Sequence, residues 1–411
     1  MDSEKKQRPL WLTILIFVAI IGIYYYFGID LTGNTNNQSA QSTPVPTAIS
    51  DSSATPAPKV TVDAFPAIAG SGGDWWQVYF TNPVWGDNAP PIGKGEDLDL
   101  TGTVAEKLIT YINSAQQTIH IASFEFNLTP VAEALIAAHK RGVDVRWMTD
   151  DEHGIEADEE DDHGQFAMLE EAGIEIRDDA RGGLMHNKFW IFDSQTLWTG
   201  STNITVNGML RNNNNVVIIE SPDLAAIYTR EFEEMWAGEH GKRSPSTVDQ
   251  QALELDGTSL QVLFAPEDEV GEKLTALLSQ AEKSIHMMAF SFTLDQMGTA
   301  VMDRVDNGVE VQAIFETRGS ETEYSELPLF YCNDIPVRQD GNPRTFHHKA
   351  FVIDGKTVAT GSFNFSNNAN ESNDENIMII HNIDIATQYI DEFNRQWAKG
   401  EAPDAEDIEC P

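Results

Sequence analysis

One pattern of histidine, lysine and aspartate occurs twice in the chain, and its residue types suit chemistry on a phosphate ester. Six residues separate each aspartate from a Gly-Ser-x-Asn turn. The two sets are His186, Lys188, Asp193, Ser201 and Asn203, and His347, Lys349, Asp354, Ser362 and Asn364. Lysine and asparagine donate hydrogen bonds to phosphate oxygens and offset the charge of the transition state. Histidine can attack phosphorus or protonate the leaving oxygen, because its pKa lies near neutral pH.

The two sets together predict a nucleophile and a general acid acting on one phosphorus, a chemistry that requires no metal or cofactor. Side chains alternate between the faces of a strand, so His186 and Lys188 point the same way. Asp193 lies seven residues after its histidine and points to the opposite face. Within the candidate catalytic motif, the aspartates are therefore expected to be structural acceptors. The serines and asparagines of the turns are the candidate phosphate-binding residues.

The pattern is part of a longer internal duplication, and the strands and helices of each repeat are expected to position the motif residues. Gly142-Val143-Asp144-Val145 recurs as Gly308-Val309-Glu310-Val311, at an offset of 166 residues. The offset falls to 161 at the histidines, and the first copy carries an acidic stretch at residues 150–162. We interpret this stretch as a solvated charge run, with a divalent-cation site or an acidic lid as alternatives. Two homologous lobes are expected, at residues 73–243 and 250–411.

Each lobe reads as strand, helix, strand, loop and strand, followed by a closing amphipathic helix. The expected strands are 118–124 and 143–148, with 284–290 and 309–315 in the second lobe. The expected helices are 131–141 and 224–236, with 297–307 and 385–397 in the second lobe. Alternating strands and helices indicate an α/β layered fold.

The duplicated motif resembles the phospholipase D superfamily over most of residues 105–400. The second repeat, at residues 345–380, is most similar to the small bacterial endonuclease branch. The resemblance implies two α-β-α sandwich lobes related by a pseudo-twofold axis, with the active site between them. Both half-sites then lie in one chain, so a monomer is expected. The resemblance also implies a phosphohistidine mechanism, with His186 as the nucleophile and His347 as the acid.

One departure from the superfamily concerns the acidic residue that follows each motif and holds the histidine ring nitrogen remote from phosphorus. Glu375 fits this role 28 residues after His347, whereas Asn214 takes the matching place after His186. An amide orients imidazole but stabilises imidazolium less than a carboxylate does. We therefore expect Glu375 beside His347, which makes that imidazole the more basic one and leaves the order of the two roles open.

The N-terminal residues predict a membrane anchor. A basic segment at residues 1–9 precedes an apolar run at residues 10–29 that is long enough to span a bilayer. The basic flank belongs on the cytoplasmic side, and no small-residue cleavage signature follows the run. We expect a single-pass signal anchor in the cell membrane, with the lobes extracytoplasmic. A cleaved signal peptide would give the same compartment. Residues 30–72 read as a disordered tether.

Composition limits the partners. The chain has 26 Lys+Arg against 65 Asp+Glu, a formal net charge of −39, which disfavours nonspecific nucleic-acid binding. Hydrophobic residues make up 41% of the chain, which supports a sizeable core and excludes a wholly disordered chain. The two cysteines, Cys332 and Cys410, are too few for a cysteine-rich metal site, and whether they pair is left open.

Three functions fit these features. The first is an extracytoplasmic phosphodiesterase that hydrolyses phospholipid head groups, favoured by the anchor, the tether and the acidic charge. The second is an endonuclease cleaving DNA or RNA, favoured by the second repeat. The third is a head-group transferase of the cardiolipin-synthase kind. A binding module without activity is disfavoured because both motifs are intact.

Overall fold

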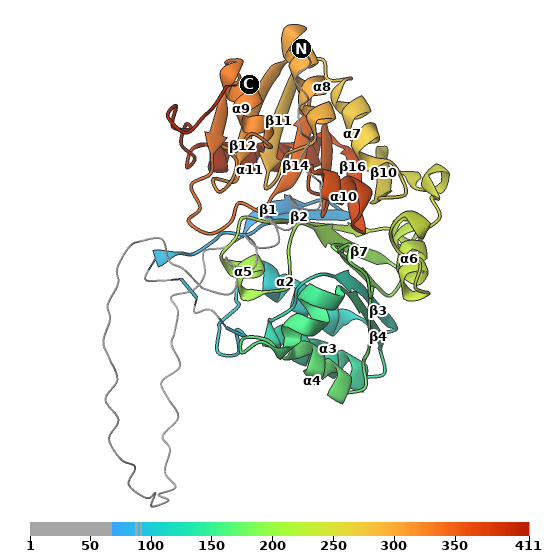
Figure 1. Cartoon of the computed structure of the whole chain (residues 1–411). Helices are drawn as coiled ribbons and strands as arrows, with labels where there is room; N and C mark the ends of the chain where they lie inside the picture. Colours follow the sequence, from blue (N-terminus) through green and yellow to red (C-terminus); the bar gives the residue numbers. More distant parts are fainter. Residues whose placement is uncertain (1–67, 87–88, 91–92, 411) are drawn as a thin grey trace, which may run out of the picture. The chain divides into compact units, whose positions relative to one another are not determined.

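The computed structural model describes residues 68–86, 89–90 and 93–410, which form two lobes (Figure 1). The expected anchor at residues 10–29 lies outside the described residues, as does most of the expected tether. Within the described part of the chain, no helix is long and apolar enough to cross a membrane.

The first lobe is built on an eight-stranded mixed sheet in the order β1-β2-β8-β7-β6-β3-β4-β5. In that order the strands are Ala69–Gly72, Trp76–Phe80, Asn215–Glu220, Thr196–Gly200, Lys188–Phe192, Thr118–Ser123, Asp144–Thr149 and Glu175–Asp178. The α-helices are α2 (Val104–Ser114), α3 (Thr129–Lys140), α4 (Gln165–Glu171), α5 (Val206–Leu210) and α6 (Pro222–Trp236). Other helical turns are η2 (Asp151–Glu156), η3 (Ala157–Glu159) and η4 (Gly241–Arg243). The turn η5 (Val248–Gln250) follows the first lobe, and its Val248 packs against the core of the second.

The second lobe repeats this arrangement, with the strand order β13-β12-β11-β14-β15-β16-β10-β9. In that order the strands are Val337–Gln339, Glu310–Phe315, Ser284–Ala289, Lys349–Ile353, Thr357–Gly361, Glu375–His381, Thr258–Ala265 and Ala252–Leu255. Its helices are α7 (Val270–Leu278), α8 (Asp295–Asp306), α9 (Glu326–Cys332), α10 (Asn367–Glu371) and α11 (Ile383–Trp397). Corresponding strands occupy the same places in both sheets, which confirms the predicted duplication and α/β class.

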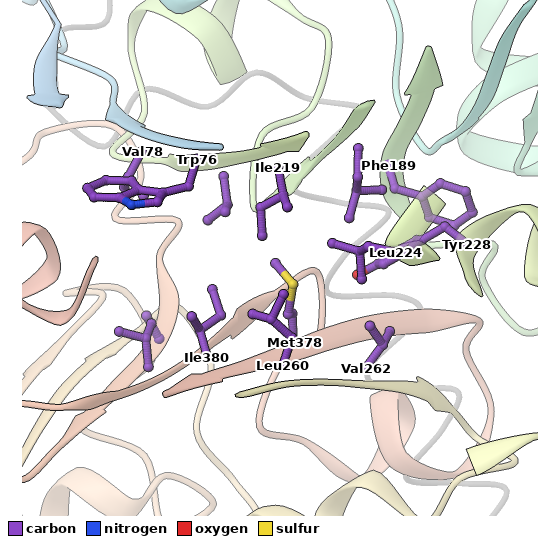
Figure 2. Packing of buried hydrophobic residues seen from close by; sticks show 14 of the residues in the cluster. Trp76, Val78, Phe189, Ile219, Leu224, Tyr228, Leu260, Val262, Met378 and Ile380 are labelled. Atoms are coloured by element: carbon purple, nitrogen blue, oxygen red, sulfur yellow. The ribbon is translucent and has the colours of Figure 1, made fainter. Parts of the chain in front are cut away.

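Helices cover both faces of each sheet. On one face of the first sheet, α2, α3 and α4 bury side chains such as Leu108 and Leu135 in a core of that lobe alone. The second lobe has a separate core of the same kind under α7, α8 and α9. The other faces, with α6 and α11, share one core that spans both lobes. Figure 2 shows Ile219 of the first lobe facing Met378 and Ile380 of the second. Burial of this apolar surface holds the lobes together.

The closing helices α6 and α11 begin where the sequence supplies a cap. Ser221 accepts a hydrogen bond from the Leu224 backbone N–H, and Pro222 follows it at the first helical position. Asn382 caps α11 in the same way through the Ile385 N–H. These caps fix the start of the two helices that pack against the shared core.

The first lobe begins earlier than predicted, because β1 occupies Ala69–Gly72 of the expected tether. The Ala-Gly-Ser-Gly sequence shows no apolar alternation, and antiparallel pairing with β2 holds it in place. At Gly70 φ is +126°, and a β-carbon there would lie 2.0 Å from the Val78 carbonyl oxygen. This edge strand therefore depends on close backbone approach, which hydrophobic patterning does not reveal.

A disulfide bond joins Cys332, at the end of α9, to Cys410, with their Cα atoms 5.7 Å apart. The sequence left this pairing open, since one possible bridge gives no geometric evidence by itself. The bond attaches the C-terminal segment to the second lobe.

Candidate active site

The two histidine motifs lie on the seam between the lobes, and each is paired with a backbone segment of the other lobe. A parallel bridge joins Met185 to Asp374, and a second joins Asn213 to Phe346. The His186 N–H donates to the Asp374 carbonyl at 2.9 Å. The His347 N–H donates to the Asn213 carbonyl at 2.8 Å. The two segments thus exchange partners across the seam.

The side chains that hold the histidine rings are exchanged in the same way. His186 Nδ1 lies 2.8 Å from Glu375 Oε2, and both side chains are buried. His347 Nδ1 lies 2.9 Å from Asn214 Oδ1 and 3.0 Å from the Ser201 carbonyl. The expected pairing of Glu375 with His347 is therefore wrong. A spacing counted within one repeat assigns each histidine a partner in its own lobe. Instead, Asn214, just before β8, and Glu375, at the start of β16, contact the histidine of the opposite lobe.

The acceptors around His347 determine which of its nitrogens carries hydrogen. Asn214 Nδ2 donates to the Gly208 carbonyl at 2.8 Å, so Asn214 Oδ1 is the atom that faces the imidazole. Both partners of His347 Nδ1 are carbonyl-type oxygens, so Nδ1 must donate. Nε2 is then unprotonated in the neutral ring and carries a proton only in the imidazolium form.

The serines of the Gly-Ser-x-Asn turns contact these orienting groups. Ser201 Oγ donates to Asn214 Oδ1 at 2.8 Å and accepts from the Asn215 N–H at 3.1 Å. Ser362 Oγ accepts from the Asn376 N–H at 3.0 Å and donates to the Asn376 carbonyl at 3.4 Å, next to Glu375 in the chain. Both serines are fully buried. Their hydroxyls are thus engaged within the protein, which differs from the predicted contact with substrate phosphate.

The two asparagines of the turns are less completely satisfied. Asn203 Nδ2 donates to Glu125 Oε2 at 2.8 Å. The Oδ1 atoms of Asn203 and Asn364 are buried without a hydrogen-bond partner among the described residues. Ser291 stands where Glu125 stands in the first lobe, since Ile204 and Phe365 donate backbone hydrogen bonds to their respective carbonyls. The surroundings of the two asparagines therefore differ, because only the first lobe places a carboxylate at this position.

The two lysines are buried beside their histidines. Lys188 Nζ donates to the His186 carbonyl at 2.9 Å, and Lys349 Nζ donates to the His347 carbonyl at 3.1 Å. Each ammonium also lies over an aromatic ring, at 5.0 Å from Phe124 and 4.7 Å from Phe290. Since an ammonium has three donors, each lysine keeps donors for a ligand.

The charged groups of the two half-sites lie close enough to shift one another's pKa values. Burial lowers the pKa of Lys188 to about 8 and holds the pKa of Lys349 well below its usual value, with Lys188 adding to the second effect. Burial raises the pKa of Glu375 to about 8, and Lys188 opposes this rise. Burial, followed by the adjacent lysine, lowers the pKa of both His186 and His347. An anionic ligand such as a phosphodiester would stabilise both ammonium groups.

Asp193 and Asp354 lie at the far ends of their strands and accept backbone hydrogen bonds. Asp193 accepts from the N–H groups of residues 116–118, and Asp354 accepts from those of residues 282–284. These contacts fix the start of β3 and β11. The aspartates thus make the structural contacts that the strand spacing predicts.

Sequence reasoning missed two acidic residues that support the histidine segments. Asp150 Oδ2 accepts from the Met185 N–H at 3.0 Å, and Glu316 accepts from the Phe346 N–H in the same way. Their position directly after β4 and β12 at the common offset of 166 was the available signal. Asp150 is buried, although it opens the stretch interpreted as solvated charge.

His153, from the same acidic stretch, lies beside the site. Its Nδ1 is 3.1 Å from Asp150 Oδ1, which raises the pKa of His153. The ring stacks on Phe124 at 4.9 Å, and Phe124 in turn meets His186 edge-on at 4.8 Å. Ligand-type atoms of Asp150, Asp151 and Asp179 lie within 4.8 Å of one another, as do those of Glu160, Asp162 and His163.

Two homologous α/β lobes, each with a histidine–lysine pair on a common seam, define a duplicated two-histidine fold of the phospholipase D kind. The chain matches the family described as "Cardiolipin synthase, PLD-like domain" over residues 108–236 and 274–397, and it belongs to this family. The resemblance inferred from the motifs is thereby confirmed.

Among curated relatives, the mitochondrial cardiolipin hydrolase of Xenopus laevis is 31% identical over 136 residues, which are 33% of this chain and 62% of that protein. A phospholipase D of Rickettsia conorii is 30% identical over 137 residues, covering 33% of this chain and 68% of that protein. The chain thus spans less than two thirds of the length of the first of these relatives.

Among solved structures, Nuc from Salmonella typhimurium is 31% identical, covering 35% of this chain and 97% of that chain, with a TM-score of 0.33. Phosphatidylserine synthase from Haemophilus influenzae covers 73% of this chain and 86% of that chain, with a TM-score of 0.56 and 16% identity. The second likeness shows the fold alone.

Proposed function

We propose that this protein is a phosphodiesterase that hydrolyses phospholipid head groups through a phosphohistidine intermediate. The contact between His186 Nδ1 and the buried Glu375 carboxylate carries the proposal. A carboxylate at Nδ1 stabilises the positive charge that the ring acquires when Nε2 bonds to phosphorus. His186 is accordingly the nucleophile, and His347, held by neutral acceptors, is the acid.

In the first step His186 Nε2 attacks phosphorus, and the bond from phosphorus to the head-group oxygen breaks. The imidazolium of His347 gives its Nε2 proton to that oxygen. In the second step neutral His347 takes a proton from water, whose oxygen attacks phosphorus while the phosphorus–nitrogen bond breaks. Lys188, Lys349 and the amides of Asn203 and Asn364 stabilise the charge on the non-bridging oxygens.

A phospholipid substrate is supported by the relatives, which include a cardiolipin hydrolase and a phospholipase D. A net charge of −39 disfavours a nucleic-acid polyanion. The disulfide between Cys332 and Cys410 is typical of an oxidising compartment, which supports extracytoplasmic lobes behind the proposed anchor at residues 10–29.

Turnover by the full-length protein in detergent and EDTA tests this proposal. Phosphatidylcholine and diphosphatidylglycerol in mixed micelles would be compared with single-stranded DNA, with the His186→Ala protein as the control for contaminating activity. We expect phosphatidate from a lipid and intact DNA. Cleavage of DNA with intact lipid would instead establish a nuclease, and alcohol-dependent transfer without hydrolysis would establish a transferase.

A further inference from the structure

A third imidazole, that of His153, lies beside the proposed nucleophile and has no part in the mechanism above. Asp150 caps the turn η2 and holds His153 twice, because its Oδ1 accepts from the His153 backbone N–H at 2.8 Å and lies 3.1 Å from the ring Nδ1. Asp150 Oδ2 accepts from the N–H of Met185, which precedes His186, at 3.0 Å. One buried carboxylate thus fixes both the His153 ring and the segment that carries the proposed nucleophile.

The ring of Phe124 places His153 next to the charged groups of the site. His153 stacks on Phe124 with ring centroids 4.9 Å apart, and His186 meets the same ring edge-on at 4.8 Å. The Lys188 ammonium lies 5.0 Å from the centre of that ring. The positive charge of His153 also helps to lower the pKa of His186, after burial and the two lysines. The His153 ring therefore belongs to the electrostatic surroundings of the nucleophile.

The contact with Asp150 determines which nitrogen of His153 remains available. A carboxylate oxygen accepts hydrogen bonds, so Nδ1 donates to it, as Nδ1 of His186 does to Glu375. The His153 side chain is 34% exposed while that of Asp150 is 1% exposed, and Nε2 makes no hydrogen bond with another described residue. The hydrogen bond to Asp150 raises the pKa of His153, burial opposes the rise, and Glu125 adds to it. In the imidazolium form Nε2 is thus a charged donor without a partner among the described residues.

The second lobe supports its histidine segment without such an imidazole. Glu316 takes the place of Asp150, and its partner is Arg318, whose Nε donates to Glu316 Oε1 at 2.8 Å. Three residues after Glu316 the chain has Gly319. Support of the buried carboxylate therefore does not require histidine, and the third imidazole occurs only in the lobe of the proposed nucleophile.

We propose that His153 is a further catalytic residue, whose Nε2–H donates a hydrogen bond to a non-bridging oxygen of the phosphoryl group while that group is transferred to and from His186. This inference rests on the proposed phosphodiesterase function. No bond to phosphorus forms or breaks at His153, and its proton stays on Nε2. The imidazolium offsets the negative charge of the phosphoryl oxygens in both steps, as the two lysines do.

Two substitutions separate the contact with Asp150 from the donor at Nε2. In His153→Asn the side-chain amide can still donate to Asp150, but no atom remains at the position of Nε2. In His153→Gln the amide nitrogen reaches the position of Nε2, and the donor to Asp150 is lost. With bis(p-nitrophenyl) phosphate and the full-length protein, we expect kcat to fall on the order of thirtyfold in His153→Asn, as for loss of one charged hydrogen bond. It should fall roughly threefold in His153→Gln, because a neutral donor remains.

Two further variants complete the test. His153→Phe keeps the stack on Phe124 without any donor, and its kcat should fall as far as in His153→Asn. His163→Asn is the matched control, since His163 belongs to the same acidic stretch and its Nδ1 contacts Asp162 at 3.1 Å. This variant should leave kcat unchanged. Melting temperatures of all variants ensure that kcat is compared between folded proteins.

A loss in His153→Gln that equals or exceeds the loss in His153→Asn would overturn the proposal, because the contact with Asp150 would then be what matters. Unchanged kcat in both His153→Asn and His153→Phe would overturn it as well. Neither result would affect the phosphodiesterase, which turnover by the wild type and its loss in His186→Ala test separately. Absence of wild-type turnover would remove both proposals.

Discussion

The two lobes share one fold and one motif, yet they hold their histidines with groups of different charge. His186 of the first lobe contacts the carboxylate of Glu375, whereas His347 of the second contacts the amide of Asn214. Glu375 and Asn214 are equivalent positions of the repeat, at the offset of 161 residues. One difference at a repeated position thus gives the two histidine rings orienting groups of different charge.

The largest expected effect separates the roles of the two histidines. His186→Ala and His347→Ala should each lower kcat by about 10⁴-fold on a lipid, near the upper range for general acid–base groups. With bis(p-nitrophenyl) phosphate, whose leaving group needs no proton, only His347→Ala should regain substantial first-step turnover. A burst of p-nitrophenolate measured by stopped flow checks this. Recovery in His186→Ala instead would reverse the assignment.

The lysines should contribute more equally than the histidines. Each lysine donates to the carbonyl of its own histidine and keeps donors for phosphate, so the lobes are alike here. Lys188→Ala and Lys349→Ala should each lower kcat/KM on the order of a hundredfold, comparable to loss of one oxyanion donor. Steady-state kinetics on one lipid would measure both variants. A loss confined to one lysine would place the phosphate mainly in one lobe.

The pH dependence should distinguish the two orienting groups. Glu375, with a pKa of about 8, is ionised above this pH, whereas Lys188, also with a pKa of about 8, is charged below it. Activity needs both charges, so protonation of Glu375 contributes an acidic limb to kcat/KM below pH 8, and loss of the Lys188 charge contributes an alkaline limb above it. Loss of the His347 proton adds to the alkaline limb, because burial lowers the pKa of that ring as well. Glu375→Gln should remove the acidic limb and cost on the order of tenfold above pH 8, with a smaller loss at pH 6, where the carboxyl is already protonated.

Asn214→Asp is the matched comparison, because it places a carboxyl group beside the other histidine. This variant should retain the acidic limb that Glu375 produces. An acidic limb that survives in Glu375→Gln but disappears in Asn214→Asp would show that the pH dependence arises at His347.

The smallest expected difference between the lobes concerns the two aspartates. Both have positive φ values, 52° for Asp193 and 53° for Asp354, which asparagine also tolerates. Asp193→Asn and Asp354→Asn should each lower the free energy of unfolding by about 1–3 kcal/mol, the range for hydrogen bonds to a charged group. Urea denaturation would measure this, and kcat of the folded protein should change less than about twofold. A much larger loss of kcat would give the aspartate a part in the chemistry.

Much of the fold follows from local patterns in the sequence. The offset between the repeats and the alternation of apolar runs predict the strands and helices that carry the motifs, and α3 and α8 begin within two residues of the expected positions. Edge strand β1 escapes prediction because its glycine-rich sequence is held by backbone pairing with β2.

The site was only partly predictable, because its decisive contacts join residues that are far apart in the chain. His186 and Glu375 are 189 residues apart, and no spacing within one repeat connects them. The serines illustrate the same limit, since a hydroxyl beside a phosphate site is indistinguishable in sequence from one that anchors a buried amide.

Because the lobes exchange partners at the seam, neither lobe can orient its own histidine when it is separated from the other. The bridges Met185–Asp374 and Asn213–Phe346 mean that each lobe carries the orienting group for the other lobe's histidine. If the chain were cut between the lobes, each fragment would contain a motif but no oriented imidazole. Activity would then depend on the concentrations of both fragments, so turnover would report the fraction of fragments that had reassembled.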